Sequence, residues 1–189
     1  VVAVIDTGVD YTHEELKDYL WYQIGALREF CRAAGVELQH VKPHGALYHM
    51  AGQDEAVARA IGEAVQASGE RMILIAPAGG AFERHCRAMG CRVASEGFAD
   101  RAYNRDGSLR SRALPGALIT DPEHAAAQAV QIAREGRVTA FDGTEVVLDV
   151  QTICCHGDTP GAPAIVRAVR ERLEKAGITV RPIGLWLSR

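Results

Sequence analysis

Apolar and polar residues alternate along this chain with two different periods. Residues 1–5 form a continuous apolar run, mostly β-branched, which is typical of a strand buried on both faces in a parallel sheet. Further on, Leu16, Leu20 and Ile24 begin a helical spacing that continues until Gly35. The first 35 residues therefore predict a buried strand followed by a long amphipathic helix.

The rest of the chain continues to alternate between strand-like and helix-like hydrophobic patterns. Helices are predicted at 54–67, 81–89, 121–135 and 162–176, and strands at 37–42, 71–76, 92–94, 152–155 and 179–183. Residues 138–148 predict a hairpin with a type I′ turn at Asp142-Gly143. Alternating strands and helices indicate an α/β fold, and a length of 189 residues is compatible with one domain over 1–189.

One predicted connection is unusually long. Residues 96–116 are polar and rich in arginine and glycine, which leaves either a functional loop or a disordered one. The composition favours an ordered, functional loop.

Composition narrows the classes of partner. The net charge is −3 and the arginines are spread among acids, so nucleic acid is not an expected partner. No apolar run approaches the roughly 20 residues needed to span a bilayer, so we expect no membrane role. The five cysteines form no CxxC pair, and residues 1–20 do not resemble a signal peptide; both observations favour the cytoplasm.

Polar clusters follow three of the predicted strands. Asp6 ends the first, Lys42 and His44 follow the second, and His156 with Asp158 follows the strand at 152–155. Ligands of α/β proteins gather where strands end, so these side chains are candidates for one site, although each histidine alone is more often structural. Lysine can hold an anionic oxygen, while histidine and aspartate can transfer protons or activate water.

Other candidates are less specific. Asp100, Arg101, Tyr103 and Arg112 fill the long loop, where arginines can clamp a carboxylate or phosphate, or simply form solvated salt bridges. His44, His156 and Asp158 are an incomplete ligand set for a metal, so a metal remains an open alternative. The adjacent Cys154 and Cys155 point to opposite faces of their strand and are expected in the core. The glycines of HGDTPGAP weakly suggest a phosphate cradle at the next helix.

Four motifs in order give a resemblance to a known family. They are YQIGAL (22–27), VKPHGALY (41–48), ADRAY with DG, Arg112 and Gly116 (99–116), and HGDTPG (156–161). From about residue 14 to 177 the chain resembles the LamB/YcsF family. The resemblance implies an irregular (β/α) barrel related to the glycoside hydrolase and deacetylase barrels. It also implies a role in ATP-dependent conversion of 5-oxo-L-proline to L-glutamate with 5-oxoprolinase subunits B and C.

Residues 1–16 carry a second resemblance. Asp6-Thr7-Gly8 and His13 are similar to the aspartate block of subtilisin-like serine proteases, although Glu14 stands where those proteases commonly have proline. Their histidine and serine motifs are absent from the chain, as are the DLN-, GFHAGDP- and HPGYPD-type motifs of the first strands of LamB/YcsF proteins. We therefore expect the N-terminal barrel strands to be missing or replaced, with residues 1–5 capping a partial barrel.

These observations favour a cytoplasmic hydrolase subunit that acts on a cyclic amide, uses ATP within its complex, and has an unknown metal requirement. His44, His156 and Asp158 are the expected catalytic residues. The expected substrate-binding residues are Lys42, Asp100, Arg101, Tyr103 and Arg112. The alternatives are a non-catalytic remnant that only binds partners and, with least support, a protease fragment. A strand edge left exposed predicts self-association.

Overall fold

The computed structural model describes residues 13–69 and 71–187. They belong to two compact units, one formed by Val1–Ala94 with Ile183–Arg189 and the other by Ser95–Pro182. We call these unit 1 and unit 2. The strand predicted at 1–5, with Asp6, lies outside the described residues.

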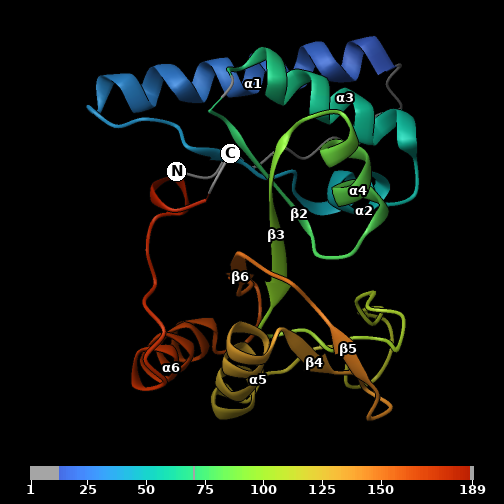
Figure 1. The fold of residues 1–189 in the computed structure, drawn as a ribbon, viewed down its shortest axis with the longest axis vertical. Coiled ribbons are helices and arrows are strands. Elements are labelled where there is room, and N and C mark those ends of the chain that lie inside the picture. Colours follow the sequence, from blue (N-terminus) through green and yellow to red (C-terminus); the bar gives the residue numbers. More distant parts are fainter. Residues whose placement is uncertain (1–12, 70, 188–189) are drawn as a thin grey trace. The chain divides into compact units, whose positions relative to one another are not determined.

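Unit 1 contains the N-terminal helices and the first strands (Figure 1). Helix α1 (His13–Ala33) packs against α3 (Glu55–Ala67), and α3 contacts both the short α2 (Gly45–Met50) and α4 (Ala81–Ala88). Strands β1 (His40–Val41) and β2 (Ile73–Pro77) pair in parallel, and β3 (Arg92–Phe98) begins in this unit. The predicted α/β class is thus confirmed.

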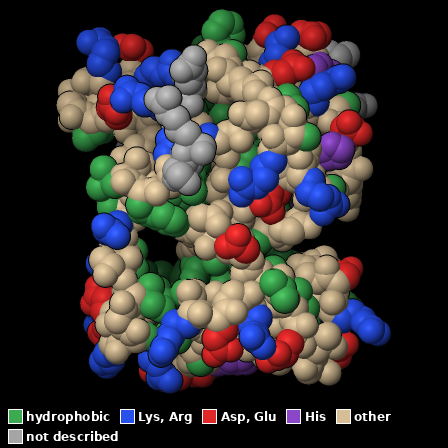
Figure 2. Space-filling model, viewed as in Figure 1, with side chains coloured by type: hydrophobic (Ala, Val, Ile, Leu, Met, Phe, Trp, Pro, Cys, Tyr) green, Lys and Arg blue, Asp and Glu red, His purple; other side chains and the backbone are tan. Residues whose placement is uncertain are grey.

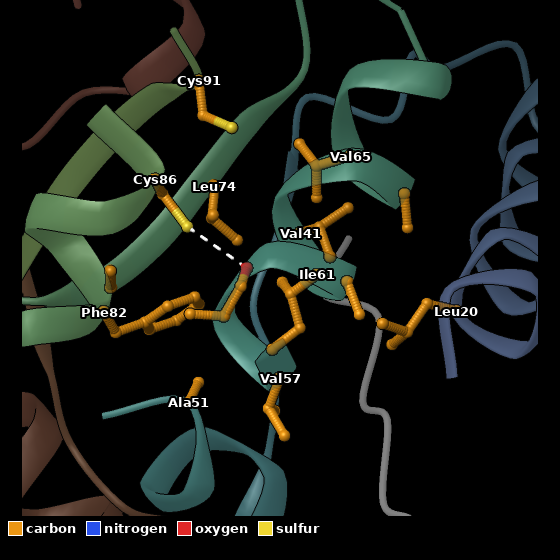
Figure 3. Packing of buried hydrophobic residues seen from close by; sticks show 14 of the residues in the cluster. Leu20, Val41, Ala51, Val57, Ile61, Val65, Leu74, Phe82, Cys86 and Cys91 are labelled. Atoms are coloured by element: carbon orange, nitrogen blue, oxygen red, sulfur yellow. Dashed lines mark hydrogen bonds between the residues drawn. The ribbon is translucent and has the colours of Figure 1, made fainter. Parts of the chain in front are cut away.

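The core of unit 1 lies where α3 faces the sheet and its neighbouring helices. Figure 3 shows Leu20, Ile61 and Phe82 among the buried side chains, with Cys86 donating a hydrogen bond of 3.7 Å to the carbonyl of Ala58. The Phe82 side chain is fully buried and meets the Tyr48 ring edge-on, with centroids 6.3 Å apart. Apolar residues at helical spacing on α1 and α3 account for this packing.

Unit 2 contains the remainder of β3, strand β6 (Thr152–Cys154), the hairpin β4 (Arg137–Thr139) and β5 (Glu145–Val147), and helices α5 (Pro122–Glu135) and α6 (Ala162–Lys175). β3 and β6 are parallel, and the strand order is β1-β2-β3-β6. Helices α5 and α6 pack on each other around small residues such as Ala125 and Ala129, with Ile165 filling the space between them.

Most predicted elements are present, but three differ. Strand β1 is shorter than the predicted 37–42, while β3 extends four residues beyond 94 to Phe98. No strand forms at 179–183; instead a 3₁₀ turn, η1, occupies Ile183–Leu185. Residues 179–182 are exposed and pair with no strand among the described residues, and Pro182 has no N–H to donate to one. The short helix α2 was not predicted, because six residues are too few to show a period.

The hairpin is confirmed but its turn type is wrong. A type I′ turn needs positive φ at both Asp142 and Gly143, yet among the described residues only glycines have positive φ. The N–H of Gly143 donates to the carbonyl of Ala140, and Gly143 has φ +86°. This is a type I turn followed by a left-handed glycine, which adds one residue to the predicted loop.

The cysteines and helices agree in part with expectation. All five cysteines are free, but Cys154 and Cys155 are half-buried rather than in the core. Among the residues that the structure describes, no helix is both long and apolar enough to cross a membrane. On the face drawn in Figure 2, basic and acidic side chains are interspersed.

Replacing Phe82 by alanine should lower the free energy of unfolding by about 3–5 kcal/mol, because it removes a fully buried ring from a packed core. Phe30→Ala is the matched control, since Phe30 is 75% exposed, and it should change stability by less than about 0.5 kcal/mol. Urea unfolding followed by circular dichroism measures both. Equal losses in the two variants would contradict the packing described for unit 1.

Candidate functional site

The candidate site is built where β3 and β6 end side by side in unit 2. The register pairs Phe98 with Cys154, so the residues that follow each strand emerge at the same edge of the sheet. Asp100 follows β3, and His156 follows β6. Two polar segments far apart in sequence, both singled out as candidates, are therefore brought together.

The Asp100 carboxylate is the centre of this site. It is fully buried, and it accepts three hydrogen bonds: from the backbone N–H of His156 at 2.8 Å, from the Thr159 hydroxyl at 2.9 Å, and from Nδ1 of His156 at 2.9 Å. Burial alone would raise its pKa, but the hydrogen bonds from His156 and Thr159 hold the pKa of Asp100 below its ordinary value. Asp100 is therefore ionised at neutral pH.

An ionised Asp100 determines the protonation pattern of the histidine. Because the carboxylate can only accept, Nδ1 of His156 carries the proton of this bond, which leaves Nε2 as the ring nitrogen available for proton transfer. The His156 ring also stacks on Phe98, with centroids 5.7 Å apart and planes inclined by 14°. The side chain is 21% exposed, so Nε2 belongs to a fixed ring that still reaches solvent. This arrangement suits a general base.

The segment that carries Asp100 is held in place by a side chain of helix α5. The side-chain amide nitrogen of Gln128 on α5 donates its two hydrogens among three carbonyls, those of Phe98 and Arg101 at 2.8 Å and that of Ala99 at 3.2 Å. Gln128 is buried, so these bonds join α5 directly to the backbone on both sides of Asp100. The long loop is thus ordered, as its composition indicated.

Two predicted residues of the loop support its structure. Arg101 is 3% exposed and donates to the carbonyls of Arg110 at 2.7 Å and Ala117 at 3.4 Å. The buried hydroxyl of Tyr103 accepts from the backbone N–H of Phe98 at 2.8 Å, and burial raises its pKa. Both side chains hold the loop against the end of β3.

Arg112 and Asp158 form a separate, exposed pair. Nη1 of Arg112 lies 2.7 Å from Oδ2 of Asp158, and the two side chains are 45% and 65% exposed. The hydrogen bond and charge of Arg112 lower the pKa of Asp158. An exposed pair of this kind is worth at most about 1 kcal/mol, so it can open at little cost. The carboxylate bonded to the His156 ring is that of Asp100, not that of Asp158, which was expected to be catalytic.

Lys42 and His44 lie in unit 1, in the segment between β1 and α2. The ammonium of Lys42 is 5.5 Å from the centroid of the Tyr48 ring, a cation–π distance. His44 is exposed and occupies the N-cap position of α2, without a side-chain capping bond. Their catalytic and substrate-binding roles stay predictions.

The phosphate cradle suggested for HGDTPGAP does not fit the helix that follows it. In the first turn of α6, the N–H groups of Ala162 and Ala164 donate to the carbonyls of Thr159 and Gly161, and Pro163 has none. The N–H groups expected to bind a phosphate are therefore occupied or absent. Within the described part of the chain, no group of three or more metal-ligating side chains gathers either.

Sequence reasoning missed three contributors to this site. Thr159 was quoted only as part of a motif, and Phe98 lay beyond the predicted end of its strand. The sequence could have pointed to Gln128, because it lies on the buried face of α5 between Ala125 and Ile132. The other buried residues of that face are all apolar.

Comparisons with known proteins give matches over most of the chain. The model of the LamB/YcsF family matches residues 7–187. A protein from Pyrococcus furiosus, named as the A subunit of 5-oxoprolinase, is 47% identical over 173 residues, which cover 92% of this chain and 68% of that one. Another of the same name from Chloroflexus aggregans is 52% identical over 167 residues, covering 88% and 66%.

A solved structure is similar as well. The crystal structure of the lactam utilization protein from Thermus thermophilus has a TM-score of 0.88 and 46% sequence identity, and the match covers 93% of this chain and 70% of that one. The resemblance of residues 1–16 to a subtilisin-like protease gains no support, since the family match already begins at residue 7. The chain belongs to the LamB/YcsF family.

Proposed function

We propose that this chain is the A subunit of an ATP-dependent 5-oxoprolinase, which with subunits B and C converts 5-oxo-L-proline to L-glutamate. Relatives of that name are 47–52% identical to most of the chain, which supports the proposal. The observation that carries it is the bond between the buried Asp100 carboxylate and Nδ1 of His156. The irregular (β/α) barrel of the glycoside hydrolase/deacetylase type and the cytoplasmic location are part of the same proposal.

The reaction needs a group that moves protons. Hydrolysis of the cyclic amide adds water to the carbonyl carbon, breaks the ring C–N bond and leaves a proton on the released nitrogen. Nε2 of His156 can take the proton from the attacking water and give it to that nitrogen. Asp100 stabilises the imidazolium formed in between, because its carboxylate is ionised and 2.9 Å from Nδ1. Asp100 acts by positioning and charge rather than by contact with the substrate.

The substrate also carries a carboxylate of its own. Arg112 is an exposed guanidinium of the long loop, and its partner Asp158 can be exchanged for a substrate carboxylate, which a guanidinium can bind bidentately. Asp158 would then be released to hold water or the substrate nitrogen. Arg101 adds positive charge from its buried position in the loop.

Replacing His156 by alanine should lower kcat for glutamate release by about 10²–10⁴-fold, because the general base is lost. The measurement uses the full chain mixed with subunits B and C. His124→Ala, an exposed histidine of α5, is the control and should leave kcat unchanged. Wild-type chain that binds B and C in a pulldown without any turnover would instead favour the partner-binding remnant.

Replacing Arg112 by glutamine should raise KM for 5-oxo-L-proline by about ten-fold or more, because a charge-assisted hydrogen bond is worth about 1.5–3 kcal/mol. Arg105→Gln removes an exposed arginine of the same loop and should leave KM unaltered. An unchanged KM in Arg112→Gln would assign the carboxylate to another residue.

Replacing Asp100 by asparagine should lower the free energy of unfolding by about 1–3 kcal/mol at pH 7, because the amide cannot accept all three bonds. Since the folded pKa of Asp100 is lowered, its contribution is present above the unfolded pKa of about 3.9 and is lost as the pH falls through the folded value. The difference from wild type should therefore shrink between pH 7 and pH 3.

Urea unfolding at both pH values checks this. Asp158→Asn removes an exposed carboxylate and should cost less than about 1 kcal/mol at pH 7. A wild-type advantage over Asp100→Asn that grows on acidification would show that Asp100 is protonated in the folded protein.

A further inference from the structure

A groove of about 890 Å³ in unit 1 is lined by four arginines. Arg28 and Arg32 project from the C-terminal half of α1, Arg71 comes just before β2, and Arg92 is the first residue of β3. The groove therefore lies at the end where the parallel strands begin. Asp100 and His156, by contrast, follow the ends of their strands.

Two of the four charges are compensated within the groove. Arg32 Nε is 2.9 Å from the Glu29 carboxylate, and Arg71 Nη2 is 3.5 Å from that of Glu37. These side chains are all largely exposed, so the pairs form its rim.

Arg28 and Arg92 are bonded only to backbone carbonyls within the described ranges. Arg28 donates to the carbonyl of Ser68, while Arg92 donates to those of Arg71 and Leu187. No carboxylate among residues 13–69 and 71–187 forms an ion pair with either guanidinium. A carbonyl orients a guanidinium but does not neutralise it, so two positive charges remain on the groove.

One donor of Arg92 is both buried and unused. Its Nε atom is shielded from solvent and has no hydrogen-bond partner in the described part of the chain. Buried N–H groups in native proteins are almost always bonded, so this orphan leaves the hydrogen-bonding capacity of Arg92 incompletely used. Because Nε is closed to solvent, a ligand in the groove can meet Arg92 only through its Nη atoms.

We propose that this groove binds a phosphate-class oxyanion through Arg28 and Arg92. Two guanidinium groups match the nearly double negative charge of a phosphate, and the N–H donors that their carbonyl bonds leave over can bond its oxygens. The group can come from free orthophosphate or from the terminal phosphate of a nucleotide. The site is separate from the proposed hydrolytic site and requires no turnover.

Calorimetric titration of the full chain, first with potassium phosphate and then with ADP at constant ionic strength, tests the proposal. Wild type should bind saturably, and Arg92→Gln and Arg28→Gln should each bind about ten-fold more weakly or worse, because each loses a charge-assisted bond. Arg59→Gln removes an exposed arginine of α3 outside the groove and should bind like wild type. Arg28 is itself exposed, so its variant reports on the groove even if Arg92→Gln does not fold.

The outcomes separate clearly. Tighter binding of ADP than of orthophosphate identifies a nucleotide as the source of the phosphate, and equal binding identifies the free ion. Either result supports the site if both groove variants lose the binding. No saturable binding of either probe, or undiminished binding by Arg28→Gln, overturns the proposal. Glutamate release is not measured, so this result and that for the proposed function fail or hold independently.

Discussion

Unit 2 is organised around a carboxylate that is charged and yet wholly removed from water. Burying an isolated ion is very costly, so the ionised Asp100 can exist only because three donors converge on it. Two of these come from His156, which follows β6, and one from Thr159, so satisfying a single charge fastens the loop after β6 to the loop after β3. The position of His156 thus follows from the need of the buried Asp100 carboxylate for hydrogen-bond donors.

The two proposed sites use charge in opposite ways. In unit 2 the buried charge is fully compensated, and its neighbours are thereby held in one arrangement. In the groove of unit 1, carbonyl groups fix Arg28 and Arg92 without neutralising them. Compensated charge makes a rigid catalytic geometry, while uncompensated charge leaves affinity for a ligand.

The sequence predicts the elements of this fold far better than their contacts. Long helices such as α1, α3 and α5 can be predicted because many residues repeat the same spacing of apolar side chains. N-cap residues such as Asp121 mark where such helices begin. The extension of β3 to Phe98 could not be predicted, because Glu96 and Gly97 are poor strand residues that form a strand only by pairing with β6. Candidate site residues were recognisable, but the partner of His156 was not, since Asp100 and Asp158 are chemically equivalent until the chain folds.

The contacts of the Gln128 amide with three carbonyls have one more consequence. A helix rotates by about 100° and rises about 1.5 Å at each residue, so one inserted or deleted residue between the start of α5 and position 128 would turn that amide away from all three carbonyls. The position of the segment that carries Asp100 thus depends on the register of α5. Length, as much as side-chain identity, is what this helix must preserve.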